Sequence, residues 1–452
     1  MGYNLLNGIR VLDLTMVFAG PIASKILASM GAEVIKIEST TRVDAFTRTN
    51  VYPENNPGEE PWNNGSFFHC LNVGKRGISL NLAREEGREI FRRLVKISNV
   101  VIENFSPRVM EKWGLGYDDL KKIRTDIIMV SLSGLGHSGP QKDSIMYVPG
   151  MEGMSGLTHM TGYPEEPPLL SGHAYGDWVL GATGAAAVMV ALYHRMKTGE
   201  GQYVDVAGRE AVACHIGEII MDFSLNGRDQ TRKGNRHSSK APQGCYFCKG
   251  DDSWVTITLE NDEQWMRFCH VLGDPPWTRD ERFADGDSRW QNQDALDAFI
   301  EAWTTQYDKH MVMEMLQTAG VPAGAVLTMK EIHLDSHLRE RGFFDVIDHG
   351  GNVGKRPIPK QLPAKFTGVE TFTPKKAPRF GEDNSYVFAD LLGMSEEEMK
   401  VLEDNGVIGG RPNLPPARPT RKDLIETQHS GWFDQDYLEG LKKIYGDDIG
   451  KG

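Results

Sequence analysis

The stretch IRVLDLTMVFAGPIASKILASMGAEVIKIE, residues 9–38, decides the fold of the first part of this chain. Ile9–Leu14 is a short apolar strand, Gly20–Gly31 follows as a helix, and Glu33–Ile37 is a second strand. Two strands joined through a helix pair in parallel, and the helix packs on one face of their sheet. The stretch therefore predicts a parallel sheet.

The same alternation continues to about residue 140. It predicts further strands at Ile78–Leu82, Val100–Glu103 and Ile127–Leu132, with an amphipathic helix over Arg84–Ile97. This rhythm is typical of an α/β fold with a Rossmann-like parallel-sheet large domain.

A polar, glycine-containing segment, residues 226–244, interrupts this rhythm and predicts a connection into a separate unit. A hairpin over residues 245–259, three helical segments and a strand at Gly320–Val326 leading back follow it. We therefore predict a large domain, a smaller α+β domain, a return to the large domain and a C-terminal extension, over residues 1–225, 226–330, 331–410 and 411–452 respectively.

The overall composition restricts the class of protein. The 452 residues carry a formal net charge of −12, which argues against nucleic acid or an anionic membrane as the main partner. Five cysteines do not make a disulfide framework, and the Cys245/Cys248 pair lacks the further ligands of a zinc site. We interpret both as packed thiols and expect no metal.

The longest apolar run, residues 178–193, is too short to span a bilayer, and no secretion signal opens the chain. We therefore expect a soluble, cytoplasmic protein.

Several nucleotide and hydrolase motifs are missing. Glu38 follows the second strand as in dinucleotide-binding enzymes, but the turn over residues 15–21 has one glycine where that fingerprint needs three. The chain also lacks a Walker A sequence and a Gly-x-Ser-x-Gly elbow. Basic residues near strand ends, with Asn104 and Phe105, predict instead a cradle for a nucleotide phosphate and its ring: Lys75, Arg76, Arg108 and Lys112.

A single carboxylate, Asp177, lies where a Tyr-Gly turn meets a long apolar helix over residues 178–193. The positive end of the helix macrodipole and the first-turn N–H groups should hold this carboxylate ionised. The pattern alone allows two roles, an N-cap or a nucleophile toward an activated carbonyl.

Short motifs in a fixed order cover about residues 5–408. They are Gly8–Asp13, Ala19–Pro21, Gly31–Glu38, Lys75–Ile78, Glu103–Phe105, Ser133–Gly136, Gly139–Pro140, Gly176–Asp177, Lys197–Val206, Gly320–Gly324 and Gly381–Asn384. In this order they resemble the class III coenzyme A transferases. That family includes formyl-CoA, carnitine and benzylsuccinate CoA-transferases and α-methylacyl-CoA racemases.

The resemblance implies that Asp177 is the nucleophile. The carboxylate would attack a donor thioester, form a mixed anhydride and then an aspartyl-CoA thioester, which the acceptor acid attacks in turn. Backbone N–H groups at the helix start would stabilise the oxyanions. No prosthetic group or metal is implied, and coenzyme A and acyl-CoA are substrates.

The resemblance also implies a coenzyme A site in the first part of the large domain. Its contacts are Phe18, Ala19, Arg42, Leu80, Asn81, Leu82, Ala83, Asn104, Phe105, Ser106, Lys112, Ser144, Ile145, Met146 and Tyr147. The arginine that often follows the Lys-Ile-Glu run in the family is Ser39 here, so we expect Arg42 to replace it.

Two alternatives stay open at this point. A racemase needs a histidine in the stretch that here reads Lys-Asp-Ser-Ile-Met-Tyr, residues 142–147, and none is present. A CoA-binding subunit of a heteromeric transferase would be favoured by loss of the nucleophile, but Asp177 is retained.

The acyl substrate is suggested by apolar residues near the nucleophile, namely Trp178, Met146, Met151, Met154 and Tyr175. We expect succinyl-CoA as donor and an aromatic or dicarboxylic acceptor such as benzylsuccinate. The glycine-rich lid of formyl-CoA transferase is absent at residues 237–240, which argues against formate or oxalate.

The resemblance further implies an interlocked dimer, either a homodimer or a heterodimer with a homologous subunit. Its active site would lie between the large domain of one chain and the small domain of the other. We expect the C-terminal extension to wrap over a surface.

Overall fold

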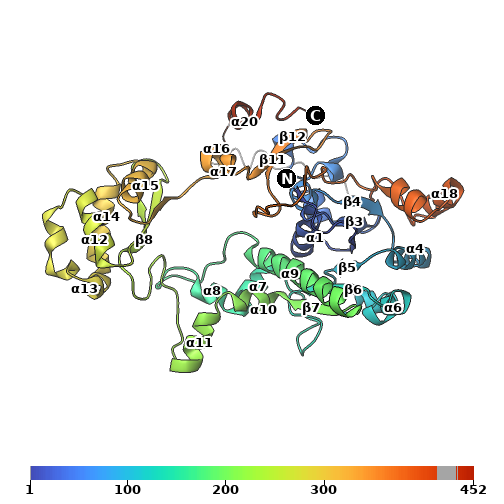
Figure 1. The fold of residues 1–452 in the computed structure, drawn as a ribbon, viewed down its shortest axis with the longest axis horizontal. Helices are drawn as coiled ribbons and strands as arrows, with labels where there is room; N and C mark the ends of the chain where they lie inside the picture. Colours follow the sequence, from blue (N-terminus) through green and yellow to red (C-terminus); the bar gives the residue numbers. More distant parts are fainter. Residues whose placement is uncertain (1, 415–433, 435, 452) are drawn as a thin grey trace. The chain divides into compact units, whose positions relative to one another are not determined.

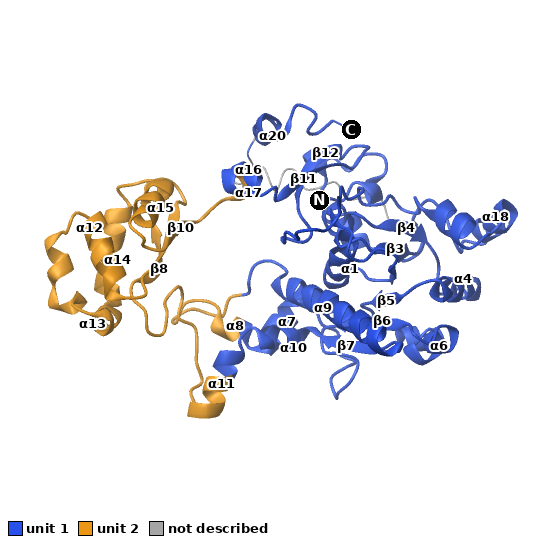
Figure 2. Cartoon of the chain, in the orientation of Figure 1, with its two compact units in different colours: residues 1–157, 170–220, 334–452 blue, residues 158–169, 221–333 orange. Residues whose placement is uncertain are grey.

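The computed structural model describes residues 2–414, 434 and 436–451. The chain forms two compact units (Figure 2). Unit 1 comprises residues 1–157, 170–220 and 334–452, and unit 2 comprises residues 158–169 and 221–333. Unit 2 includes residues 158–169, which we had assigned to the large domain, because backbone and side-chain hydrogen bonds tie Gly162 to Gly234 and Tyr163 to Asn235.

Unit 1 is built on a six-stranded sheet in the order β4-β3-β2-β5-β6-β7 (Figure 1). All neighbouring strands in it are parallel, which confirms the predicted fold class. The strands are β2 (Arg10–Asp13), β3 (Glu33–Glu38), β4 (Arg76–Ser79), β5 (Val100–Glu103), β6 (Ile128–Ser133) and β7 (Tyr203–Ala207).

Two of these strands differ from the prediction. β4 ends at Ser79, so the apolar Leu80 and Leu82 follow the strand instead of forming its centre. β7 was missed because it is an edge strand whose residues are mostly exposed or half-buried, and its apolar pattern is correspondingly weak.

Helices cover both faces of the sheet. On one face, α1 (Ala19–Ser29) and α9 (Tyr175–Thr198) share a core with the sheet. On the other face lie the buried side chains of α4 (Glu85–Lys96), α6 (Tyr117–Ile123) and α18 (Glu396–Asp404).

Glycines let α9 approach α1 and β6 closely. A Cβ at Gly181 would lie 2.6 Å from the Ala19 carbonyl oxygen, and one at Gly184 would lie 2.7 Å from Leu132. Judged by length and composition alone, this helix of 24 residues could cross a membrane. Our expectation that its apolar part is too short was therefore wrong. Of its most apolar window, 44% is buried.

Unit 2 has its own core around a three-stranded antiparallel sheet, in the order β10-β9-β8. The strands are β8 (Gln243–Phe247), β9 (Trp254–Thr258) and β10 (Ala323–Ala325), and the helices are α12 (Asp262–Val271), α13 (Gly286–Gln291), α14 (Gln293–Thr304) and α15 (Lys309–Thr318). The segment that we predicted to lead back is therefore the third strand of this sheet. Cys248 is fully buried directly after β8.

The remaining part of unit 1 contains the hairpin β11 (Phe344–Asp348) and β12 (Lys355–Pro359). Of the predicted C-terminal extension, residues 415–433, 435 and 452 lie outside the described residues. Its last helix, α20 (Tyr437–Tyr445), packs against the hairpin of its own chain through the rings of Tyr445 and Phe344. An ion pair of 3.0 Å between Lys355 and Asp448 adds a second contact.

A buried ion pair joins the end of β3 to the segment that follows it. The Arg48 guanidinium donates to both carboxylate oxygens of Glu38 and to the Trp62 carbonyl, and it stacks on the Phe68 ring at 3.5 Å. Glu38 is the acid that a dinucleotide site would use for ribose, but here its carboxylate is fully engaged by Arg48.

Replacing Arg48 by Met should lower the free energy of unfolding by about 3–5 kcal/mol, because Glu38 would stay buried without a counter-charge. Chemical denaturation followed by circular dichroism measures this. The matched control is Arg10→Met, which breaks a partly exposed pair with Glu33 and should cost about 1 kcal/mol or less. Equal losses of unfolding free energy in the two variants would contradict the assignment of Glu38 and Arg48 as a buried ion pair.

Candidate active site

A cavity of about 350 Å³ in unit 1 contains Asp177 in its wall. It lies beyond the carboxyl ends of β2, β5 and β6, where parallel sheets place their ligands. Most of the predicted coenzyme A contacts line this same cavity: Phe18, Ala19, Arg42, Asn104, Phe105, Ser106, Ser144, Ile145, Met146 and Tyr147.

The other predicted contacts lie elsewhere. Leu80 and Leu82 are buried in the sheet core, and the Asn81 side chain accepts a hydrogen bond from the Ala83 N–H. Lys112 is exposed on the short helix α5 (Val109–Lys112) and does not line the cavity.

Two of the basic residues that we expected to cradle a phosphate have structural partners instead. Lys75 is 2% exposed, and its ammonium group donates to Asp13 at 3.0 Å. Arg76 forms ion pairs with Glu33 and Asp383. The prediction for these two residues was therefore wrong, because the sequence does not reveal their acidic partners.

Further residues of the wall were not predicted as contacts. They are Met16, Val17, Pro107, Leu132, Ser133, Gly134, Leu135, Lys142, Val148, Met151 and Leu180. The run Ser133–Gly136 was among the ordered motifs, so its signal was present in the sequence. Lys142 carried no comparable signal, because a single lysine in a polar loop is usually solvated.

The loop between β2 and α1 is held in a strained conformation. Val17 has φ of 67°, which is a rare conformation for a β-branched residue. Its N–H donates to Asp44 at 3.0 Å, while both backbone groups of Met16 bond the Asn104 amide at 2.8 Å. Such strain persists only when surrounding contacts enforce it, so these bonds fix the shape of the cavity wall.

Asp177 is the third residue of α9 and not its N-cap, which is Ala174. The side chain is half-buried, and burial together with the nearby Glu152 raises its pKa to about 7. We expected the helix start to hold this carboxylate ionised; with a pKa of about 7 it is only partly ionised at neutral pH, because burial and the like charge of Glu152 favour the protonated form.

Glu152, in α7 (Val148–Ser155), keeps its place through a separate set of bonds. It is 1% exposed and accepts hydrogen bonds from Ser171 and from the Gly176 N–H. The carboxylate therefore anchors the turn that presents Asp177 while it also raises the pKa of that residue.

A buried cation contacts Trp178, the residue that follows Asp177. The Lys25 side chain, on a residue that is 3% exposed, places its ammonium group 4.6 Å from the centre of the Trp178 ring. Within the described residues it has no acidic partner in an ion pair, and burial lowers its pKa. An ammonium group held this way gains from any anion that comes within reach.

The guanidinium carbon of Arg42 lies 5.9 Å from the centre of the Phe105 ring, and both residues line the cavity. Ile145 and Tyr147 are 85% and 70% exposed beside it. Such exposed apolar side chains at a cavity favour a ligand or a partner chain that covers them.

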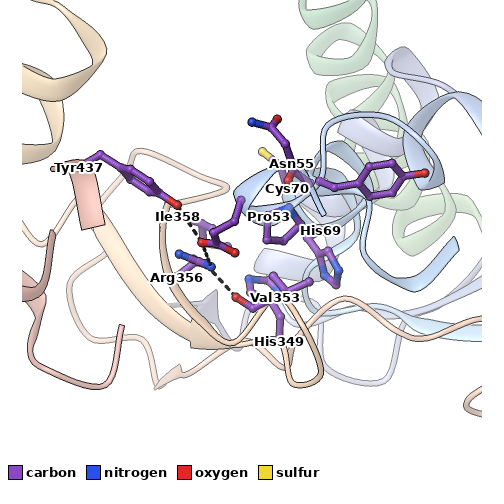
Figure 3. Close-up of a pocket in the computed structure, with 12 residues that line it drawn as sticks. Pro53, Asn55, His69, Cys70, His349, Val353, Arg356, Ile358 and Tyr437 are labelled. Carbon is purple, nitrogen blue, oxygen red and sulfur yellow. Dashed lines mark hydrogen bonds and ion pairs between the residues drawn. The ribbon is translucent and has the colours of Figure 1, made fainter. Parts of the chain in front are cut away.

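Figure 3 shows a different cavity of unit 1, also of about 350 Å³, beside α20. The rings of His69 and His349 meet edge to face there, with centres 4.6 Å apart. Burial lowers the pKa values of these histidines to about 3 and about 4, so both are neutral. Tyr437 and Arg356 both donate to Glu54 at its rim.

Comparisons with known proteins agree with this geometry. Residues 6–384 match CoA-transferase family III. A succinyl-CoA–D-citramalate CoA-transferase of Chloroflexus aurantiacus is 32% identical, over 89% of this chain and 98% of that protein. A succinate–glutarate CoA-transferase of Agrobacterium fabrum is 33% identical, over 85% of this chain and 95% of that protein.

A solved structure shows the same fold. A CAIB/BAIF family protein from Brucella suis is 32% identical and superposes with a TM-score of 0.77, over 86% of this chain and all of that chain. The chain therefore belongs to CoA-transferase family III. It is a class III CoA-transferase, an enzyme whose substrates are coenzyme A thioesters and carboxylic acids.

The raised pKa of Asp177 predicts how activity depends on pH. A carboxylate nucleophile works only when ionised, so with Asp177 in the role that the resemblance implies, kcat/KM should rise with pH and level off above about 7. Replacing Glu152 by Gln removes the like charge and should shift the midpoint to lower pH. Rates between pH 5 and pH 9 measure this, and an unchanged midpoint in the variant would contradict the assigned cause.

The same shift predicts a stability effect. The folded state favours protonated Asp177, so ionising it costs stability as pH rises from the ordinary value near 3.8 to about 7. Asp177→Asn should therefore be more stable than the wild type at pH 8, with a free energy of unfolding higher by on the order of 1 kcal/mol after solvent screening. At pH 4 the two proteins should be about equally stable. Thermal unfolding at both pH values tests this sign.

Proposed function

We propose that the enzyme transfers coenzyme A from succinyl-CoA to an aliphatic dicarboxylic acid through covalent intermediates on Asp177. The observation that carries this proposal is the cavity in which Asp177 meets ten of the residues expected to contact coenzyme A. The names of the two curated relatives supply the substrate class, since D-citramalate and glutarate are both aliphatic dicarboxylic acids.

The chemistry proceeds in four steps. The Asp177 carboxylate attacks the thioester carbon of succinyl-CoA, and coenzyme A leaves as a thiolate, giving a mixed anhydride. The thiolate attacks the Asp177 carbonyl and releases succinate, leaving an aspartyl-CoA thioester. The acceptor carboxylate displaces the thiolate to form a second anhydride, and the thiolate then takes the acceptor acyl group and frees Asp177.

The residues around the cavity have separate roles in this proposal. Phe105 and Arg42 would hold the adenine end of coenzyme A, as a ring and a guanidinium that can stack on it. Asn104 acts indirectly, because its amide is already bonded to the Met16 backbone that shapes the wall. A half-buried Asp177 with a pKa near neutrality is a stronger nucleophile than an exposed carboxylate once it is ionised.

The comparisons correct part of our expectation about the acceptor. Neither relative described above is named for an aromatic acid, so the benzylsuccinate-like acceptor has no support and we withdraw it. The racemase alternative is not favoured either, because both relatives are named as CoA-transferases.

We also propose that a second chain completes the assembly. The helix α11 (Gly217–Asn226) has none of its residues buried, and four large apolar side chains on it are exposed by half or more: Ile220, Met221, Phe223 and Leu225. A row of this kind favours a protein partner. Sedimentation of the purified protein, alone and with cell extract, would show a homodimer or a complex with a different subunit, and a monomer in both would contradict the proposal.

Trapping tests the nucleophile directly. Incubation with succinyl-CoA and hydroxylamine should convert Asp177 to a hydroxamate, which peptide mass spectrometry locates. The Asp177→Asn variant should lose transferase activity by about 10³-fold or more while keeping its fold. Modification of another residue, or none with any acyl-CoA donor, would overturn the assignment.

A further inference from the structure

The cavity of about 350 Å³ beside α20, shown in Figure 3, takes no part in the transferase chemistry described above. Its wall is formed by the loop over residues 52–55, by α3 (Ser66–Asn72), by the β11–β12 hairpin and by α20. None of the residues that line it also lines the Asp177 cavity. Its volume lies in the range of about 300–1,000 Å³ that is usual for small-molecule sites.

Two buried imidazoles in this wall leave three ring nitrogens without a hydrogen-bond partner among the described residues: His69 Nδ1, His349 Nδ1 and His349 Nε2. The residues are 7% and 4% exposed, and although their rings are in contact, no hydrogen bond joins them. Buried polar groups are normally satisfied, so these nitrogens are an exception that asks for a partner.

The protonation of the two rings defines what that partner must supply. His69 Nε2 lies 2.9 Å from the Asn63 carbonyl oxygen, so in the neutral ring it carries the proton and Nδ1 presents a lone pair. The neutral ring of His349 has one N–H and one lone pair. Together the two imidazoles offer one free donor and two free acceptors.

The loop on one side of the cavity has a strained backbone. Val51, Glu54 and Asn55 have φ of 54°, 47° and 57°, and they are three of the seven non-glycine residues with positive φ in the described part of the chain. Two residues of the cavity wall hold this loop, since Arg356 and Tyr437 both donate to Glu54 at 2.8 Å. Strain of this kind gathers at ligand-binding sites, where surrounding contacts enforce it. It is independent of the unpartnered nitrogens and lies at the same cavity.

The wall offers a ligand no unpaired charge. Besides burial, Lys376 and Arg356 lower the pKa of His349. Each of these cations is itself paired with an acid, the first with Glu382 at 2.7 Å and the second with Glu54 at 2.8 Å. A charged ligand would therefore lose its hydration without gaining a counter-charge. The wall also includes apolar side chains, namely Pro53, Val353 and Ile358.

We propose that this cavity binds a small uncharged molecule that carries a hydroxyl or carboxamide group on an apolar body. The polar group donates to His69 Nδ1 and accepts the ring N–H of His349, and the body packs against the apolar wall. A hydroxyl or a carboxamide supplies both a donor and an acceptor, whereas an ammonium group only donates and a carboxylate only accepts. A metal ion fits less well, because the described residues contain no group of three or more His, Cys, Asp or Glu side chains placed to hold one.

Histidine resonances of the full-length protein test the proposal. In protein labelled with ¹³C at the histidine Cε1 positions, benzamide and benzyl alcohol should each shift the signals of His69 and His349, and the titration gives Kd. Benzoate and benzylammonium have the same ring but a full charge, and they should bind at least about tenfold more weakly. Succinyl-CoA should not displace benzamide, because the Asp177 cavity has a separate wall.

The variant His349→Phe separates hydrogen bonding from packing. The ring nitrogens have no partner to lose, so the variant should fold. Followed through the His69 signal, benzamide binding should weaken about tenfold or more, while toluene, which makes no hydrogen bonds, should bind as in the wild type or more tightly. The same replacement at His270, whose side chain is 86% exposed in unit 2, is the matched control and should change neither affinity.

Several results would overturn the proposal. If neither benzamide nor benzyl alcohol shifts the two signals, ordered water is the partner of these nitrogens. Equal binding of benzoate or benzylammonium would remove the argument from charge, and an unchanged affinity for benzamide in His349→Phe would remove the argument from hydrogen bonding. Displacement of benzamide by succinyl-CoA would assign the cavity to the transferase substrate instead.

Discussion

The buried carboxylate of Asp13 is the group on which the geometry of the large domain depends. It is 0% exposed at the end of β2 and accepts hydrogen bonds from Thr15, Ser24 and the Lys75 ammonium. These donors lie in the loop after β2, in α1 and before β4, so one anion joins three segments. Its partners hold the pKa of Asp13 down to about 2, against the effect of burial, and the loop it fixes forms the wall of the Asp177 cavity.

The wall of the Asp177 cavity shows the opposite electrostatic arrangement. Asp13 is surrounded by donors and a cation, whereas Asp177 is half-buried near the like charge of Glu152, and its pKa rises to about 7. The fold therefore stabilises one carboxylate as an anion and disfavours the anion of the other, Asp177, which we propose as the nucleophile. The second arrangement costs stability, and the contacts around Asp13 and around the Glu38–Arg48 pair offset that cost elsewhere in the same unit.

Much of the fold was predictable because its signals are local. The strands and helices of residues 9–38 follow from hydrophobic periodicity and from the glycines at their ends. Most expected coenzyme A contacts meet in one cavity because they occupy successive loops at the carboxyl edge of a parallel sheet. The edge strand β7 was missed because half-exposed residues carry little periodic signal. Lys75 and Arg76 were misassigned because acidic partners distant in sequence hold them.

The sequence by itself determined the parallel sheet, the family and the carboxylate at the start of α9, since each depends on residues that are neighbours along the chain. Only the tertiary structure decided which charged side chains lie beside an opposite charge and which do not. Asp13 meets Lys75, Asp177 meets Glu152, and Glu103 faces Ser131 and His137, each across long stretches of chain. Burial and charge proximity set pKa values and binding sites, and both arise from packing between segments that no local pattern encodes.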